Sequence, residues 1–236
     1  MNTRRKFLVQ GSLASAALLA IKPFKTISGS SQLQSLTGFS VNENKVVVAH
    51  TSDVGNANVT HTQQVLSEMK STTGNLLLLH AGHHAADKAT RYTYDASMKN
   101  TKTAASASGS YQIVYKGNYK IGIITADCHE SDLISKINRL SGYLKNERDC
   151  HLVVCLSQLG YKNNSSVDDR TLAEQSSNLD LIVGGQNDNH SKHPVIVLNK
   201  NSEEVIINHS AANNFYIGQI HLGFNDAGKK MNVSFC

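Results

Sequence analysis

The sequence has little cysteine, and its few cysteines exclude the commonest covalent and metal-bound frameworks. Four occur in 236 residues, at Cys128, Cys150, Cys155 and Cys236. Their spacing matches neither a known disulfide framework nor a zinc-binding pattern. We therefore expect buried free thiols, and we expect a chain of this length to be stabilised by a substantial hydrophobic core.

Beyond residue 25 the chain also lacks an excess of charge of either sign. The whole sequence has 23 basic and 18 acidic residues, but five of the basic ones and none of the acidic ones fall within the first 25 residues. The remainder carries eighteen of each, so its net charge is near zero. The basic character therefore comes from the N-terminus, and no nucleic-acid partner is predicted.

The N-terminus instead has the pattern of an export signal. Near the start of the chain, a basic cluster of Arg4, Arg5 and Lys6 is followed by a short, mostly apolar run. We interpret residues 1–30 as a twin-arginine-type signal peptide with a linker. An ordinary secretory signal with a chance arginine pair is the alternative, and no convincing cleavage site follows. The run is too short and too polar for a confident membrane span, so no stable span is expected after signal removal. Residues 31–44 form a polar, flexible linker. The predicted location is the periplasm or cell envelope.

Residues 45–236 are predicted to form one domain in which strands and helices alternate. Short apolar runs predict strands, and apolar residues at helical spacing predict helices. The expected strands are 46–50, 76–80, 111–115, 119–126, 151–156, 179–183, 195–198, 204–208, 216–224 and 231–235. The expected helices are 58–71, 133–144 and 167–176. Residues 88–110 show no periodicity and are expected to form a long irregular loop.

Strand–helix alternation predicts an α/β fold with parallel pairing, and the strand-only C-terminal part predicts antiparallel additions. Ligands of such folds bind beyond the carboxyl ends of the parallel strands. The polar candidates at those ends are Asp53, His80, His83, His84, His129, Gln158, Gln186, Asp188, His190 and His209. Polar residues also collect at strand ends because those ends meet solvent, so several of the histidines are expected there by chance.

The order of several segments resembles the metallophosphatase domain of bacterial 5′-nucleotidases, a calcineurin-like phosphoesterase family. The segments are VVVAHTSDVGN, NLLLLHAGHHAAD, YKIGIITA, LVVCLSQLGY, LAEQSSNLDLIVGGQNDNH and FYIGQIHLGFNDAGKKM. The resemblance covers about residues 45 to 235. It implies a four-layer α/β/β/α sandwich with mixed sheets. It also implies two divalent metals that activate water to attack a phosphate ester.

Most of the metal ligands that the resemblance implies are replaced in this sequence. Asp53 keeps the aspartate of the Asp-x-His motif, but the Gly-Asn-His-Glu segment has no counterpart in the stretch between Asp87 and Tyr111. At four other remnant positions another residue replaces a ligand histidine, namely Gly55, Gln158, Gln186 and Asp188. At the fifth, His83 replaces the bridging aspartate. One divalent ion on Asp53, His83 and Asp188 is conceivable, but a two-metal centre is not, because an imidazole lone pair cannot bridge two cations.

Three functions follow from this pattern. The favoured one is a non-catalytic binding domain without a cofactor, acting with a separate nucleotide-binding or active nucleotidase subunit. The second is a residual phosphoester hydrolase with a rebuilt single-metal site. The third is an envelope solute-binding protein, for which the cleft at the strand ends is still the expected pocket.

Overall fold

The computed structural model describes residues 44–52, 59–82, 94–97, 104–106, 109–127, 131–162, 167–185, 193–210 and 217–235. All of them belong to one compact unit, Ser40–Cys236. The predicted signal and all but the last residue of the predicted linker lie outside the described residues. In the described part of the chain, no helix is both long enough and apolar enough to cross a membrane.

The first sheet contains five strands in the order β12-β11-β1-β2-β3. Their bounds are Lys45–Thr51 for β1, Leu76–His80 for β2, Ala96–Ser97 for β3, Gly218–Phe224 for β11 and Lys230–Phe235 for β12. β1, β2 and β3 are parallel, whereas β11 and β12 are antiparallel to their neighbours. The sheet is therefore mixed, with its parallel strands together at one side.

The second sheet contains seven strands in the order β4-β5-β6-β7-β8-β10-β9. Their bounds are Ala104–Ser106 for β4, Gly109–Lys116 for β5, Tyr119–Ala126 for β6, Leu152–Ser157 for β7, Leu181–Gly184 for β8, Val195–Leu198 for β9 and Glu204–His209 for β10. The central strands β6, β7, β8 and β10 are parallel, and the outer ones are antiparallel. Nearly every residue of the central strands is buried, as expected for a parallel sheet covered on both faces.

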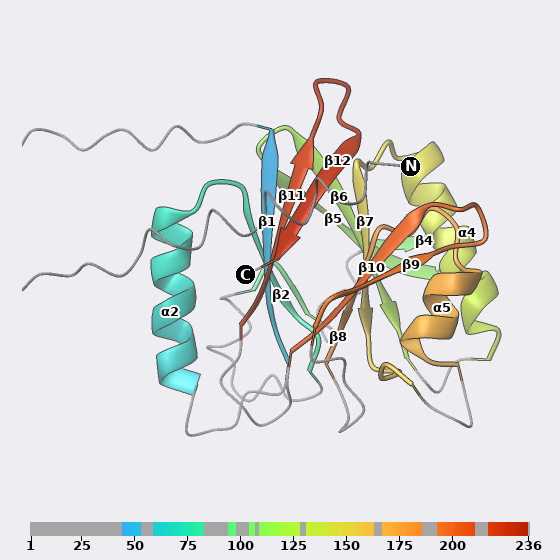
Figure 1. The fold of residues 1–236 in the computed structure, drawn as a ribbon, viewed down its shortest axis with the longest axis horizontal. Coiled ribbons are helices and arrows are strands. Elements are labelled where there is room, and N and C mark those ends of the chain that lie inside the picture. Colours follow the sequence, from blue (N-terminus) through green and yellow to red (C-terminus); the bar gives the residue numbers. More distant parts are fainter. Residues whose placement is uncertain are drawn as a thin grey trace, which may run out of the picture. The chain divides into compact units, whose positions relative to one another are not determined.

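In the described part of the chain, three helices cover the outer faces of the two sheets (Figure 1). They are α2, Val59–Thr72, α4, Leu133–Asn146, and α5, Asp169–Gln175. One core cluster joins inward-facing residues of both sheets, a second joins α4 and α5 to the second sheet, and a third joins α2 to the first sheet. The layers are therefore helix, sheet, sheet and helices, which confirms the predicted α/β/β/α class.

The structure differs from the sequence prediction within residues 88–110. The sequence predicts an irregular loop there, but the stretch contains β3, β4 and the first residues of β5. β3 pairs with β2 through two residues, and β4 pairs with β5 through three. Strands this short are held by backbone hydrogen bonds. Their Ala- and Ser-rich sequence therefore shows no alternation of apolar and polar residues that would predict a strand.

Candidate functional site

The carboxyl ends of the parallel strands from both sheets come together at one edge of the sandwich. The Oγ of Ser52, just after β1, donates a hydrogen bond to the carbonyl of Ser210, just after β10, at 3.1 Å. Gly185, just after β8, packs so closely on Ala81, just after β2, that an added Cβ would lie 2.9 Å from the Ala81 backbone. These two contacts join the ends of the sheets and make this edge the candidate site.

A small polar cluster closes the first sheet at this edge, on its outer face. The hydroxyl of Thr51 lies 3.0 Å from Nδ1 of His80 and 2.7 Å from the hydroxyl of Tyr94. The rings of His80 and Tyr94 also contact each other, with centroids 5.1 Å apart. All three side chains are buried, and burial raises the pKa of Tyr94 while its hydrogen bond to Thr51 opposes that shift. The phenol is therefore held neutral as a hydrogen-bonding group.

A second buried cluster lies on the outer face of the second sheet, against α5. The carboxylate of Asp169 accepts a short hydrogen bond from the Ser157 hydroxyl through one oxygen. Its other oxygen lies 2.8 Å from Nε2 of His209. The ring of Tyr161 meets His209 edge-on, with centroids 5.9 Å apart. Asp169 and Ser157 are fully buried, so this cluster is part of the protein interior.

Local sequence explains how Asp169 reaches this position. Asp168 caps α5 by accepting a hydrogen bond from the Thr171 backbone N–H at 2.7 Å. Asp169 is then the first residue of the helix, where a carboxylate is favoured by the helix dipole, and it faces the sheet together with Leu172 and Ala173. Gly184 leaves room for the histidine, because a Cβ there would lie 2.1 Å from Cδ2 of His209.

The Ser157–Asp169–His209 cluster does not have the order of a nucleophilic triad. In a triad the histidine stands between serine and acid, so that it can take the hydroxyl proton. Here the acid stands in the middle, and serine and histidine both bond to its carboxylate. With Ser157 fully buried, the arrangement stabilises the strand ends and offers no activated nucleophile.

His50 occupies the space between the two sheets at the same edge. Its side chain shares the inward face of β1 with Val46 and Val48, and it is fully buried against Gly218, where an added Cβ would lie 2.2 Å from its Nε2. Neither ring nitrogen has a hydrogen-bond partner among the described residues. Burial, assisted by the nearby His209, lowers the pKa of His50 to about 3, so the ring is neutral at physiological pH.

The structure describes three of the predicted site residues. Gln158, His80 and His209 all lie at the ends of strands and are buried there. His80 faces the α2 side of the first sheet and His209 faces the α5 side of the second, so these two do not share one cluster. The other predicted positions lie outside the described residues, namely Asp53, Gly55, His83, His84, His129, Gln186, Asp188 and His190.

Sequence reasoning missed several residues of the edge. It does not predict that Asp169, Ser157, Tyr94 and His50 meet there. The one available signal is the position of Ser157 and His50 at the ends of apolar runs, which is the signal that identifies His209. Asp169 belongs to a helix and Tyr94 to a stretch without periodicity, so neither carries a comparable signal.

Among the residues that the structure describes, the side chains at the strand ends do not assemble the two-metal centre that the resemblance implies. Within the described ranges, no group of three or more His, Cys, Asp or Glu side chains is placed to hold a metal ion. At the end of β7 the buried Gln158 supplies a neutral amide where the resemblance implies a histidine, and an amide oxygen is a poor ligand for the transition metals that imidazole binds. The nearby His209 has its Nε2 turned to Asp169.

Comparisons with known proteins agree with this fold. No family model matches the chain, and no curated protein matches it. Among solved structures, the NAD nucleotidase of Haemophilus influenzae matches with a TM-score of 0.61 and 16% identity over 81% of this chain and 49% of its own. A 5′-nucleotidase precursor from Thermus thermophilus matches with a TM-score of 0.60 and 17% identity over 81% of this chain and 54% of its own.

The chain thus spans about half the length of these two structures. At this level of identity the likeness concerns the fold alone. It agrees with the sequence resemblance to the metallophosphatase domain of 5′-nucleotidases, and the α/β fold with two mixed sheets is one that this chain shares with nucleotidases.

Proposed function

We propose that this chain is a non-catalytic domain of the 5′-nucleotidase type that binds a nucleoside or nucleotide without hydrolysing it. The observation that carries the proposal is the buried Gln158 at the end of β7. The hydrolytic mechanism of the resembling family needs an imidazole there to hold a metal. A glutamine offers no comparable ligand, although it can hydrogen-bond to a base or a sugar as both donor and acceptor.

The surroundings of Gln158 support a binding role over a catalytic one. The adjacent Ser157 and the nearby His209 both form hydrogen bonds to the Asp169 carboxylate. Two groups that could act on a substrate are therefore engaged in contacts within the protein interior. General acid–base catalysis requires such groups within hydrogen-bond reach of the substrate. These bonds hold the described strand ends together and leave Gln158 as a polar group beside them.

The decisive experiment measures metal content and activity on protein purified without chelators. Inductively coupled plasma mass spectrometry is expected to find almost no bound metal, and AMP and p-nitrophenyl phosphate are expected to remain intact with added zinc or manganese. Calorimetric titration is expected to show saturable binding of AMP or adenosine. The matched variant Gln158→Ala should weaken that binding, whereas Gln175→Ala, at the exposed end of α5, should not.

Two results would reject this proposal in favour of its alternatives. One equivalent of tightly bound metal, lost in Asp53→Ala, with hydrolysis that also needs His83, would establish the rebuilt single-metal hydrolase. Absence of both hydrolysis and binding of AMP or adenosine would favour the envelope solute-binding protein.

Export and a partner subunit also belong to the proposal. Replacing Arg4 and Arg5 by lysine preserves charge but removes the arginine pair that a twin-arginine signal needs, so the protein should remain in the cytoplasm. An ordinary secretory signal would tolerate that change. The proposed partner, a separate nucleotide-binding or active nucleotidase subunit, should co-purify with the exported chain from the envelope fraction.

A further inference from the structure

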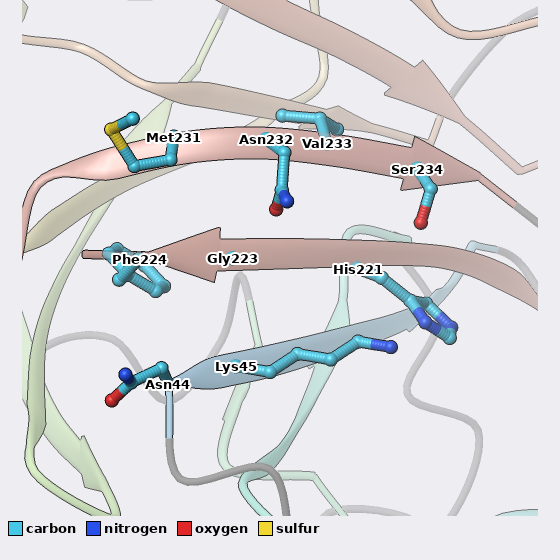
Figure 2. Close-up of a pocket in the computed structure, with 9 residues that line it drawn as sticks. All are labelled: Asn44, Lys45, His221, Gly223, Phe224, Met231, Asn232, Val233 and Ser234. Atoms are coloured by element: carbon cyan, nitrogen blue, oxygen red, sulfur yellow. The ribbon is translucent and has the colours of Figure 1, made fainter. Parts of the chain in front are cut away.

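A polar groove of about 410 Å³ opens on the outer face of the first sheet, at the opposite end of β1 from the candidate site (Figure 2). It lies across β1, β11 and β12. Its volume falls within the range of small-molecule sites, roughly 300–1,000 Å³. The groove is independent of the strand-end edge, so it does not rest on the function proposed above.

Strand register places the polar side chains of the groove in two cross-strand rows. Lys45, Gly223 and Asn232 stand opposite one another in the first row. His221 and Ser234 stand opposite each other in the second. Residues opposite one another in a sheet project from the same face, so the four side chains other than Gly223 all face the groove. Figure 2 shows the Lys45 side chain extended along the sheet toward His221, with Asn232 and Ser234 directed toward β11.

The groove exists because α2 covers only part of this face. Val47 and Ala49 of β1 are buried in the cluster that α2 forms with the sheet, and Gln219 of β11 contacts Met69 of the helix. Lys45 is half-buried, and Asn232 and Ser234 are exposed. A solvent-accessible, polar concavity is therefore left beside the edge strand β12.

Gly223 makes the floor of the groove flat. A Cβ at this position would lie 1.9 Å from Oδ1 of Asn232, which no side chain could tolerate without displacing the amide. Glycine in a strand interior weakens a sheet and often marks a place where another group approaches the backbone closely. Here it lets the Asn232 amide lie across the neighbouring strand.

The charge of the groove is positive and is not neutralised by its own lining. None of the residues that line it is acidic, and the Lys45 ammonium forms no ion pair within the described part of the chain. At the rim, the Asp226 carboxylate accepts a hydrogen bond from the Asn44 amide at 3.3 Å, so Asn44 is already engaged. Burial and then the Lys45 charge lower the pKa of His221, as expected for two basic groups that share one space.

A second groove, of about 670 Å³, shows the contrast. Its lining includes Lys145 and Lys230, but both lysines meet the same carboxylate, because Asp180 lies 2.7 Å from Lys145 and 3.8 Å from Lys230. In this second groove a carboxylate of the lining neutralises the lysines. The lining of the groove at Lys45 contains no carboxylate that could do the same.

We propose that the groove formed by Lys45, His221, Asn232 and Ser234 is a binding site for a small oxyanion, a phosphate or carboxylate group of a soluble ligand. Lys45 supplies the charge, and the His221 ring N–H, the Asn232 amide and the Ser234 hydroxyl donate hydrogen bonds to the oxygens. The tetrahedral phosphate matches this set of separate donors better than a planar carboxylate does.

The test is an NMR titration of the ¹⁵N-labelled chain with inorganic phosphate, and separately with acetate, at pH 6 and constant ionic strength. Saturable shifts are expected at Lys45, His221, Asn232 and Ser234, together with a rise in the pKa of His221, because a bound anion favours the imidazolium. Shifts confined to the strand-end residues His80 and His209 would instead place the anion at the other site and overturn the proposal.

Variants separate a specific site from general attraction. Lys45→Gln should weaken phosphate binding about tenfold, because a charged hydrogen bond is lost, and His221→Asn should reduce the pH dependence of binding to that of the phosphate itself. Lys70→Gln, at an exposed position in the last turn of α2, should leave the affinity within about twofold of the parent value. Saturation by acetate as well as phosphate would support the site with carboxylate as a second source. Failure of both anions to saturate, or an equal loss in Lys70→Gln, would overturn it.

Discussion

The Asp169 carboxylate and Nε2 of His209 lie 2.8 Å apart in the interior, and they join the first turn of α5 to the end of β10. The same carboxylate also holds Ser157 at the end of β7. One side chain therefore fixes three elements that border the candidate site. Its removal is the most direct test of how that edge is stabilised.

We expect Asp169→Asn to lower the free energy of unfolding by about 1–3 kcal/mol. Asparagine keeps the volume but has one acceptor oxygen, so either Ser157 or His209 loses its partner in a buried environment. Urea unfolding followed by circular dichroism measures the change. Glu174→Gln is the control, because it removes an exposed i,i+4 pair with Arg170 and should cost less than about 0.5 kcal/mol. Equal stability of the two variants would contradict the role of Asp169.

The backbone at Gly184 leads to a second prediction. A Cβ there would lie 2.1 Å from Cδ2 of His209 and 2.8 Å from the Asp169 carboxylate, so Gly184→Ala must displace the histidine. We expect a loss of about 1–3 kcal/mol in thermal unfolding. The matched control is Gly142→Ala in α4, where the added Cβ would come no closer than 3.9 Å to a side chain outside its own helix turn, and alanine is the better helix former. That variant should be stabilised by about 0.5–1 kcal/mol, and a loss of the same size in both would refute the steric argument.

The sequence predicts the framework of the domain because buried apolar residues recur at the spacing of the strand or helix to which they belong. The run Leu76–His80 is apolar and bounded by glycines, and it forms β2 with the predicted bounds. The stripe of Leu133, Ile137, Leu140 and Leu144 marks the buried face of α4. Such patterns are local, since each residue reports only whether its own side chain faces the core.

The site is harder to predict because its contacts join distant segments. The positions of His80 and His209 after apolar runs identify them as candidates, but nothing local indicates that they face opposite outer layers. Asp169 stands beside Asp168, and the sequence does not say which acid caps the helix and which enters the core. The strands β3 and β4 escape prediction because two or three residues carry no period.

His50 should make the stability of the domain depend on pH. Its folded-state pKa of about 3 lies below the unfolded value of 6.5, so protons bind preferentially to the unfolded chain between these limits. Stability is then fully present above pH 6.5 and is lost as the pH falls toward 3. The contribution of His50 amounts to about 2 kcal/mol between pH 7 and pH 5.

Urea unfolding at both pH values measures this dependence. In His50→Gln the difference between pH 7 and pH 5 should shrink by about that amount, because the titrating group is gone. Gln64→Ala, at an exposed position on α2, should keep the parent slope because it removes no titrating group. If His50→Gln and the parent lose the same stability on acidification, the ring is not buried in its neutral form.

The remaining prediction concerns the two described cysteines. Cys150 and Cys155 are thiols outside any disulfide, buried in the cluster beneath α4 and α5, as the sequence predicts, whereas Cys128 and Cys236 lie outside the described residues. Burial raises the pKa of Cys150, and the nearby lysines Lys120 and Lys145 only partly oppose it, so its reactive thiolate form is disfavoured.

In a Cys128→Ser, Cys236→Ser variant, both remaining thiols should react with Ellman's reagent at least about a hundredfold more slowly in the native state than in urea, because reaction requires local or global opening. A fast-reacting thiol in the folded variant would show that the cluster beneath the helices is open to solvent. A second Cys150→Ala replacement would then identify which sulfur is exposed.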